Sequence, residues 1–118
     1  MGARVLIVDD HAGFRRTARR ALERDGWEIV GEAADGTGAL RAAHELEPDV
    51  VLLDVGLPDM SGLEVARRLH DGAPQRAVVV ISTQDSADYR DLAVANGARG
   101  FIPKAELTGV ALAALLEG

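Results

Sequence analysis

Residues 50–62 have the sequence VVLLDVGLPDMSG, and this stretch is the strongest indication of the fold. Four consecutive aliphatic residues without polar alternation predict a strand that is covered on both faces, as in a parallel sheet. Asp54 follows them directly, before a turn rich in Gly, Pro and Asp. In open α/β sheets, ligands bind beyond the carboxyl ends of the strands. Asp54 is therefore a candidate site residue, although a carboxylate that only ends the strand and bonds to the turn would fit equally well.

The length and composition indicate one globular domain. The chain has 118 residues, of which 47% are hydrophobic and 27% charged, so it can bury a sizeable core. Its formal net charge of −6 argues against direct nucleic-acid binding and suits a site that recruits cations. The absence of cysteine excludes disulfides and Cys-based zinc sites. The first strand begins too early for a secretory signal, and no apolar run approaches membrane-spanning length, so we expect a cytoplasmic domain without membrane contact.

The rest of the chain predicts strands and helices in alternation. Mainly apolar segments predict three more strands, at residues 5–8, 77–81 and 99–102, and polar–apolar alternation predicts a short edge strand at residues 28–33. Apolar residues at helical spacing predict five helices, which run through residues 14–22, 40–46, 63–69, 92–93 and 107–116. This alternation implies right-handed βαβ units, and hence an α/β fold with a doubly wound five-stranded parallel sheet in one domain, residues 1–118.

Local signals predict the ends of some helices. Ser61 with Glu64 three residues later is a capping-box signature that would open the third helix. Asp85 and Ser86 are candidate caps for the fourth helix, and Gly97 should end it.

Polar side chains stand at the ends of several predicted strands, namely Asp9, Asp10, Asp54, Ser82 and Lys104. The carboxyl ends of parallel strands share one edge of a sheet, and the first and third strands would be adjacent at the topological switch point. The three carboxylates would then meet, which is unfavourable unless a proton or cation lies between them. Oxygen ligands without His or Cys indicate a hard cation, and Mg²⁺ commonly uses one or two carboxylates together with waters.

These residues carry a resemblance to a known family. The motifs are Asp9–Asp10, Asp54, LPDMSG at 57–62, Ser82 and FIPK at 101–104. Together they resemble the receiver domain of two-component response regulators, and the likeness covers essentially the whole chain. The segments VLIVDDH at 5–11 and GARGF at 97–101 most resemble the NarL-type branch, whose members usually carry a C-terminal helix-turn-helix output domain. We expect a receiver domain without that output domain, either stand-alone or excised from a longer protein.

The resemblance implies a flavodoxin-like strand order, 2-1-3-4-5, and a role for each site residue. Asp54 would accept a phosphoryl group from a sensor histidine kinase or a phosphotransfer protein. Mg²⁺ would be bound directly by Asp10, by Asp54 and by the backbone carbonyl of Gly56, with Asp9 acting through its water shell. Lys104 would neutralise charge on the phosphoryl oxygens.

The resemblance also implies a conformational switch formed by Ser82 and Phe101. Ser82 would bond to the acyl phosphate, and Phe101 would turn inward, which changes the face of the fourth helix, fifth strand and fifth helix and thereby controls an output domain or partner. Here Phe101 replaces the more common Tyr, Ser82 replaces the more common Thr, and Ala105 follows Lys104 where many relatives have Pro. The domain would catalyse only its own phosphorylation and slow dephosphorylation, and a homodimer is compatible with this function.

Two other functions compete with this one. An aspartyl-phosphate hydrolase on a similar sheet would have a second acid two residues after the nucleophile, where this chain has Gly56, and it would have a cap insertion. A degenerate receiver that serves only for docking would not need the acids, Ser82 and Lys104.

The histidines at 11, 44 and 70 lack metal-binding spacing, and the arginines at 15, 16, 19 and 20 fit a solvated helix face, so both sets are predicted to be ordinary polar positions.

Overall fold

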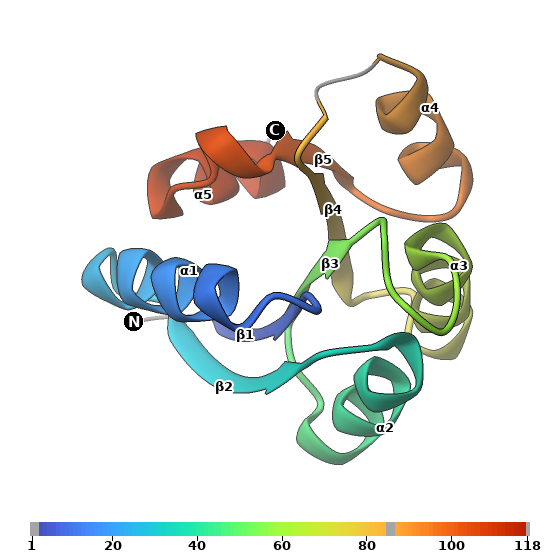
Figure 1. Ribbon diagram of the computed structural model, residues 1–118, viewed down its shortest axis with the longest axis horizontal. Helices are drawn as coiled ribbons and strands as arrows, with labels where there is room; N and C mark the ends of the chain where they lie inside the picture. The colour runs from blue at the N-terminus through green and yellow to red at the C-terminus, as the bar shows by residue number, and fades with distance from the viewer. Residues whose placement is uncertain (1–2, 85–86, 118) are drawn as a thin grey trace.

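Five parallel strands form one sheet at the centre of the molecule (Figure 1). The structure is a computed structural model, and it describes residues 3–84 and 87–117. The strands are β1 (Arg4–Val8), β2 (Glu28–Ala33), β3 (Val50–Asp54), β4 (Ala77–Ser82) and β5 (Gly100–Pro103). They lie in the order β2-β1-β3-β4-β5, and each neighbouring pair is parallel. The predicted fold class and strand order are confirmed.

Helices cover both faces of this sheet (Figure 1). They are α1 (Ala12–Arg24), α2 (Gly36–Leu46), α3 (Gly62–Gly72), α4 (Ala87–Ala95) and α5 (Gly109–Glu117), and a short 3₁₀ helix, η1 (Lys104–Glu106), follows β5. α1 and α5 pack on one face, and α2, α3 and α4 pack on the other. None of the described helices has the length and apolarity that crossing a membrane requires.

The central strands are aliphatic throughout because each of their faces meets helices. In β3 every residue is buried, and its side chains alternate between the two faces. Leu52 belongs to the core beneath α1 and α5, whereas Leu53 belongs to the core beneath α2, α3 and α4. β2 forms one edge of the sheet and exposes Glu28 and Glu32, in agreement with the alternation in its sequence.

The helix ends agree with most of the local signals. Gly97 has a φ of 90° just after α4 and allows the chain to turn back, as predicted. The capping box of α3 is only half formed: the hydroxyl of Ser61 accepts a hydrogen bond from the Leu63 N–H, but the Glu64 carboxylate pairs with Arg68 at 2.9 Å. The predicted caps of the fourth helix, residues 85 and 86, lie outside the described residues.

Candidate functional site

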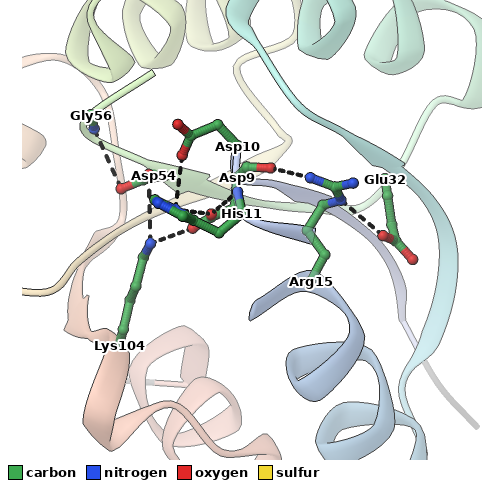
Figure 2. Close-up of polar contacts among 8 residues, drawn as sticks. All are labelled: Asp9, Asp10, His11, Arg15, Glu32, Asp54, Gly56 and Lys104. Carbon is green, nitrogen blue, oxygen red and sulfur yellow. Dashed lines mark hydrogen bonds and ion pairs between the residues drawn. The ribbon is translucent and has the colours of Figure 1, made fainter. Parts of the chain in front are cut away.

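Three carboxylates come together at the carboxyl edge of the sheet (Figure 2). β1 and β3 are neighbours, and Val8 pairs with the residue before Asp54, so Asp9 and Asp54 leave the two strands at the same level. Asp9 is fully buried and Asp54 is 5% exposed, whereas a third of the Asp10 side chain meets solvent. Oxygen atoms of all three, together with a ring nitrogen of His11, lie within 4.8 Å of one another. This convergence agrees with the prediction from the sequence, in which each aspartate stands at the end of a predicted strand.

Lys104, the first residue of η1 after β5, brings a positive charge to the same place. Its ammonium group forms an ion pair with Asp9 Oδ2 and lies 3.5 Å from Asp54 Oδ2. This contact compensates the buried Asp9 Oδ2, which has no hydrogen bond within the described chain. The ammonium also lies over the ring of Phe14 in α1, 4.6 Å from the ring centroid. The sequence predicted Phe14 only as part of the apolar face of α1, so its contact with the lysine was missed.

Burial dominates the electrostatics of Asp54. The loss of hydration at the end of β3 raises the pKa of this carboxyl above its usual value, and Lys104 acts in the opposite direction. The backbone N–H of Gly56 donates a hydrogen bond to Asp54 Oδ1 at 3.3 Å. Any further cation at this edge would favour the ionised carboxylate, which is the form that can act as a nucleophile or as a ligand.

Arg15 fixes the backbone of Asp9. Its guanidinium donates to the Asp9 carbonyl oxygen at 2.6 Å and to Glu32 Oε1 at 3.0 Å (Figure 2). Arg19 binds the other oxygen of Glu32 at 2.8 Å, and this hydrogen bond is the main reason why the pKa of Glu32 is lowered. The prediction of a solvated arginine face was therefore wrong for Arg15 and Arg19, which link α1 to β2, but Arg16 is exposed as predicted.

Ser82, the last residue of β4, and Phe101 in β5 are the two residues of the predicted switch, and both are buried. Ser82 is 4% exposed, and its hydroxyl oxygen accepts a hydrogen bond from the Gln84 N–H at 3.1 Å. Phe101 is 2% exposed, with its ring stacked on that of Tyr89 at a centroid distance of 6.1 Å. The Arg90 guanidinium lies 5.4 Å from the centroid of the same ring. The sequence did not single out Tyr89, whose aromatic ring in α4 was the available signal.

Gly56, a predicted ligand, lies on the open side of the site. It is exposed, and a Cβ atom added to it would have no atom within 4 Å. It forms an isolated antiparallel bridge with Ser61, which closes the loop between β3 and α3. The peptide after Lys104 is trans, as are all peptide bonds of the described residues.

His11 lies at the mouth of the site, where the sequence predicted only an ordinary polar residue. Its backbone N–H donates to Asp9 Oδ1 at 2.8 Å. Its ring nitrogen Nδ1 lies 2.9 Å from Asp10 Oδ1 and 3.2 Å from Asp9 Oδ1. The spacing between the three histidines was the wrong signal, because the partners of His11 are the two aspartates that directly precede it in the sequence. The DDH order at a strand end was the signal that could have found it.

The donor chemistry of this edge fits a divalent cation. Carboxylate oxygens from two neighbouring strands face one small volume, and one of the carboxylates is completely buried. Hard divalent cations prefer carboxylate, carbonyl and water oxygens, which are the donors that Asp9, Asp10, Asp54 and the Gly56 carbonyl would supply.

The sequence of the chain is similar to those of known proteins. The family model of the response regulator receiver domain matches residues 5–115. Response regulator GacA of Pseudomonas viridiflava is 37% identical over 115 residues, which cover 97% of this chain and 52% of that protein.

Two solved structures are also similar. A two-component response regulator of the LuxR family from Aurantimonas sp. SI85-9A1 has a TM-score of 0.89 and 31% identity, over 99% of this chain and 87% of that chain. The CheX-CheY-BeF3-Mg+2 complex from Borrelia burgdorferi has a TM-score of 0.85 and 26% identity, over 97% of this chain and 86% of that chain. The chain spans about half the length of the first curated relatives that it matches.

Proposed function

The chain belongs to the receiver-domain family of two-component response regulators, and from this premise we propose that it is a signalling switch whose phosphoryl acceptor is Asp54. Receiver domains of this family take part in phosphorylation-based signalling. The observation that carries the proposal is the convergence of Asp9, Asp10, Asp54 and Lys104 on one edge of the sheet. Gly56 stands where a related hydrolase would need an acid, so no observation favours the hydrolase.

The proposed reaction is an in-line transfer. A carboxylate oxygen of Asp54 attacks the phosphorus of a phosphohistidine, the bond from phosphorus to imidazole nitrogen breaks, and the released imidazole keeps the electron pair and takes up a proton. The Lys104 ammonium lies close enough to Asp54 to neutralise charge on the transferred phosphoryl oxygens. Asp54 needs no separate base, since its ionised form is the nucleophile.

Receiver domains generally bind Mg²⁺ at an acidic pocket, and the acidic group of this chain suits that ion. Asp10, Asp54 and the carbonyl of Gly56 would hold it directly, and buried Asp9 would act through a bound water. When bound, the ion would supply further charge neutralisation to the phosphoryl oxygens. Arg15 and Lys104 position Asp9 from two sides and so support this arrangement.

The switch would use Ser82 and Phe101. Phosphorylation would draw the Ser82 hydroxyl toward the phosphoryl group, because its hydrogen would donate to an anionic oxygen, which is a strong acceptor, whereas the Gln84 N–H bonds only to the hydroxyl oxygen. Phe101 is already buried and stacked on Tyr89, so phosphorylation would stabilise this inward position and the adjoining surface of α4, β5 and α5. A sensor histidine kinase or phosphotransfer protein would supply the phosphoryl group in the cytoplasm. An output domain, a separate partner or a second copy of the chain would bind the altered surface.

The test is phosphorylation by a small-molecule donor such as acetyl phosphate. With Mg²⁺ the parent should gain the mass of one phosphoryl group, and the gain should disappear after hydroxylamine treatment, which cleaves an acyl phosphate but spares a phosphoserine. Asp54→Asn should remain unlabelled. Asp71→Asn is the matched control, because Asp71 is exposed on α3 and makes no side-chain hydrogen bond among the described residues. Full labelling of Asp54→Asn, or label that resists hydroxylamine, would contradict the assignment.

A further inference from the structure

His11 places an imidazole at the mouth of the carboxylate site. Its Nδ1 is within 3.2 Å of a carboxylate oxygen of both Asp9 and Asp10, and Figure 2 shows the ring directed toward the same space as Asp54 and Lys104. The side chain is 71% exposed, so the ring can turn without disturbing the core. The backbone is held in place by the hydrogen bond from the His11 N–H to Asp9 Oδ1.

We propose that His11 is a metal ligand, and that this site binds borderline divalent ions such as Ni²⁺ and Zn²⁺ more tightly than Mg²⁺. The inference rests on the proposed function, because it assigns one more donor to the same cation site. Zn²⁺ binds imidazole nitrogen at about 2.0–2.1 Å and carboxylate oxygen at about 2.0–2.2 Å. Two opposite ligands are then separated by about 4.2 Å. The donor atoms of Asp10, His11 and Asp54 belong to a group of atoms that lie within 4.8 Å of one another, so a small adjustment of these side chains brings them to these distances.

The nitrogen donor changes which ions the site prefers. Carboxylates and carbonyls suit Mg²⁺, which keeps several waters and gains little from an imidazole. Imidazole is a good ligand for Ni²⁺ and Zn²⁺. These ions also bind mixed nitrogen and oxygen ligands more tightly than Mg²⁺ does. Removal of the His11 ring should therefore affect these ions selectively.

A second role for His11 gives the opposite expectation. If the ring only forms an ion pair with Asp9 and Asp10, it competes with every cation for the same carboxylates. Its removal would then leave all metal affinities unchanged or raise them together. The direction of the change therefore distinguishes a ligand from a competitor.

The experiment is a calorimetric titration of the whole chain with Mg²⁺, Ni²⁺ and Zn²⁺. In His11→Asn, the affinities for Ni²⁺ and Zn²⁺ should fall roughly tenfold or more, since even outer-shell partners of a metal contribute this much. The Mg²⁺ affinity should stay within about twofold. His44→Asn is the matched control, because His44 is exposed on α2 and lies outside the cluster. NMR of the ring nitrogens should show a nitrogen of His11 that shifts with Zn²⁺ but not with Mg²⁺.

The outcomes separate this inference from the proposed function. Equal affinities of His11→Asn and the parent for Ni²⁺ and Zn²⁺, or a common rise for all ions, would overturn the role of His11 and leave the Mg²⁺ site intact. Asp10→Asn should weaken the binding of all three ions. If it binds Mg²⁺ as the parent does, the cation site itself is wrongly assigned, and the inference falls with it.

Discussion

Asp59 is a surface carboxylate that joins the loop after β3 to the first turn of α2. Its Oδ1 accepts a hydrogen bond from the Gly36 N–H at 2.7 Å, and its Oδ2 accepts from the Thr37 N–H at 3.0 Å and the Thr37 hydroxyl at 2.9 Å. These N–H groups belong to the start of a helix, where backbone donors lack intrahelical partners and the helix dipole favours an anion. They lower the pKa of Asp59 to about 2.

The first prediction is a pH-dependent effect of Asp59→Asn. The pKa of Asp59 is lower in the folded protein, about 2, than in the unfolded chain, about 4. The carboxylate therefore stabilises the fold above about pH 4, and this contribution is lost as the pH falls toward 2. Asp59→Asn should unfold at a lower urea concentration than the parent at pH 7, and the difference should shrink over that acidic range. Asp71→Asn is the control, because the exposed Asp71 side chain makes no hydrogen bond among the described residues. A difference for Asp59→Asn that stays constant with pH would contradict the argument.

At the scale of single residues, the sequence predicted positions better than contacts. Asp9, Asp54 and Lys104 could be placed together because each directly follows the apolar run of a strand. Phe14 could not, because its contact with Lys104 depends on how the first turn of α1 lies above the sheet, which only the packed structure defines.

At the scale of elements, local competition limited the prediction. The capping box of α3 was half wrong because Glu64 pairs with Arg68 one turn later, and a single sequence does not show which of two partners a carboxylate takes. The 3₁₀ helix η1 follows β5 without any signal in its three residues. The strands were predicted more reliably, since a doubly covered strand requires an unbroken aliphatic run.

The second prediction concerns the contact between the start of α3 and the end of β3. A Cβ atom on Gly62 would lie 2.2 Å from the backbone carbonyl oxygen of Asp54 and 2.7 Å from the Cα atom of Val55. Gly62→Ala should push the helix away from the strand and lower the free energy of unfolding by about 1–3 kcal/mol. Urea denaturation measures this difference.

Gly72 provides the control within the same helix. A Cβ atom there would have no neighbour within 4 Å. Gly72→Ala should thus be neutral or stabilise the protein by up to about 1 kcal/mol, because alanine loses less conformational freedom in a helix. Equal stabilities of the two variants would show that the close approach at Gly62 has no energetic consequence.

At the scale of the whole molecule, chain connectivity explains most of the arrangement. A right-handed crossover from β1 to β2 runs in the opposite direction along the sheet from the crossovers that lead to β3, β4 and β5. α1 must therefore cover one face, and α2, α3 and α4 the other. Within residues 3–84 and 87–117 no strand follows β5, so the crossover rule does not determine the face on which α5 packs. Packing of Leu112 beside α1 settles it, together with a hydrogen bond from the Gly109 N–H to Asp25 Oδ2 at 3.0 Å.

The two cores on opposite faces of the sheet share the same strands. Leu52 and Leu53 are neighbours in β3, both are fully buried, and they point into different cores. Trp27 packs against the core that contains Leu52, and Tyr89 packs against the core that contains Leu53. Because the chain has one tryptophan and one tyrosine, each core has its own natural fluorophore.

The third prediction is that the two cores unfold as one unit. Leu52→Ala and Leu53→Ala should each lower the free energy of unfolding by about 2–5 kcal/mol, since each leaves a cavity in a packed core. In a cooperative domain, Leu53→Ala must also shift the urea midpoint of Trp27 fluorescence, although Trp27 lies beyond the opposite face of the sheet. Val94→Ala, at a side chain 59% exposed on α4, should change stability by no more than about 0.5 kcal/mol. If Leu53→Ala shifts the far-UV circular dichroism transition but not that of Trp27, the shared strands do not couple the two faces.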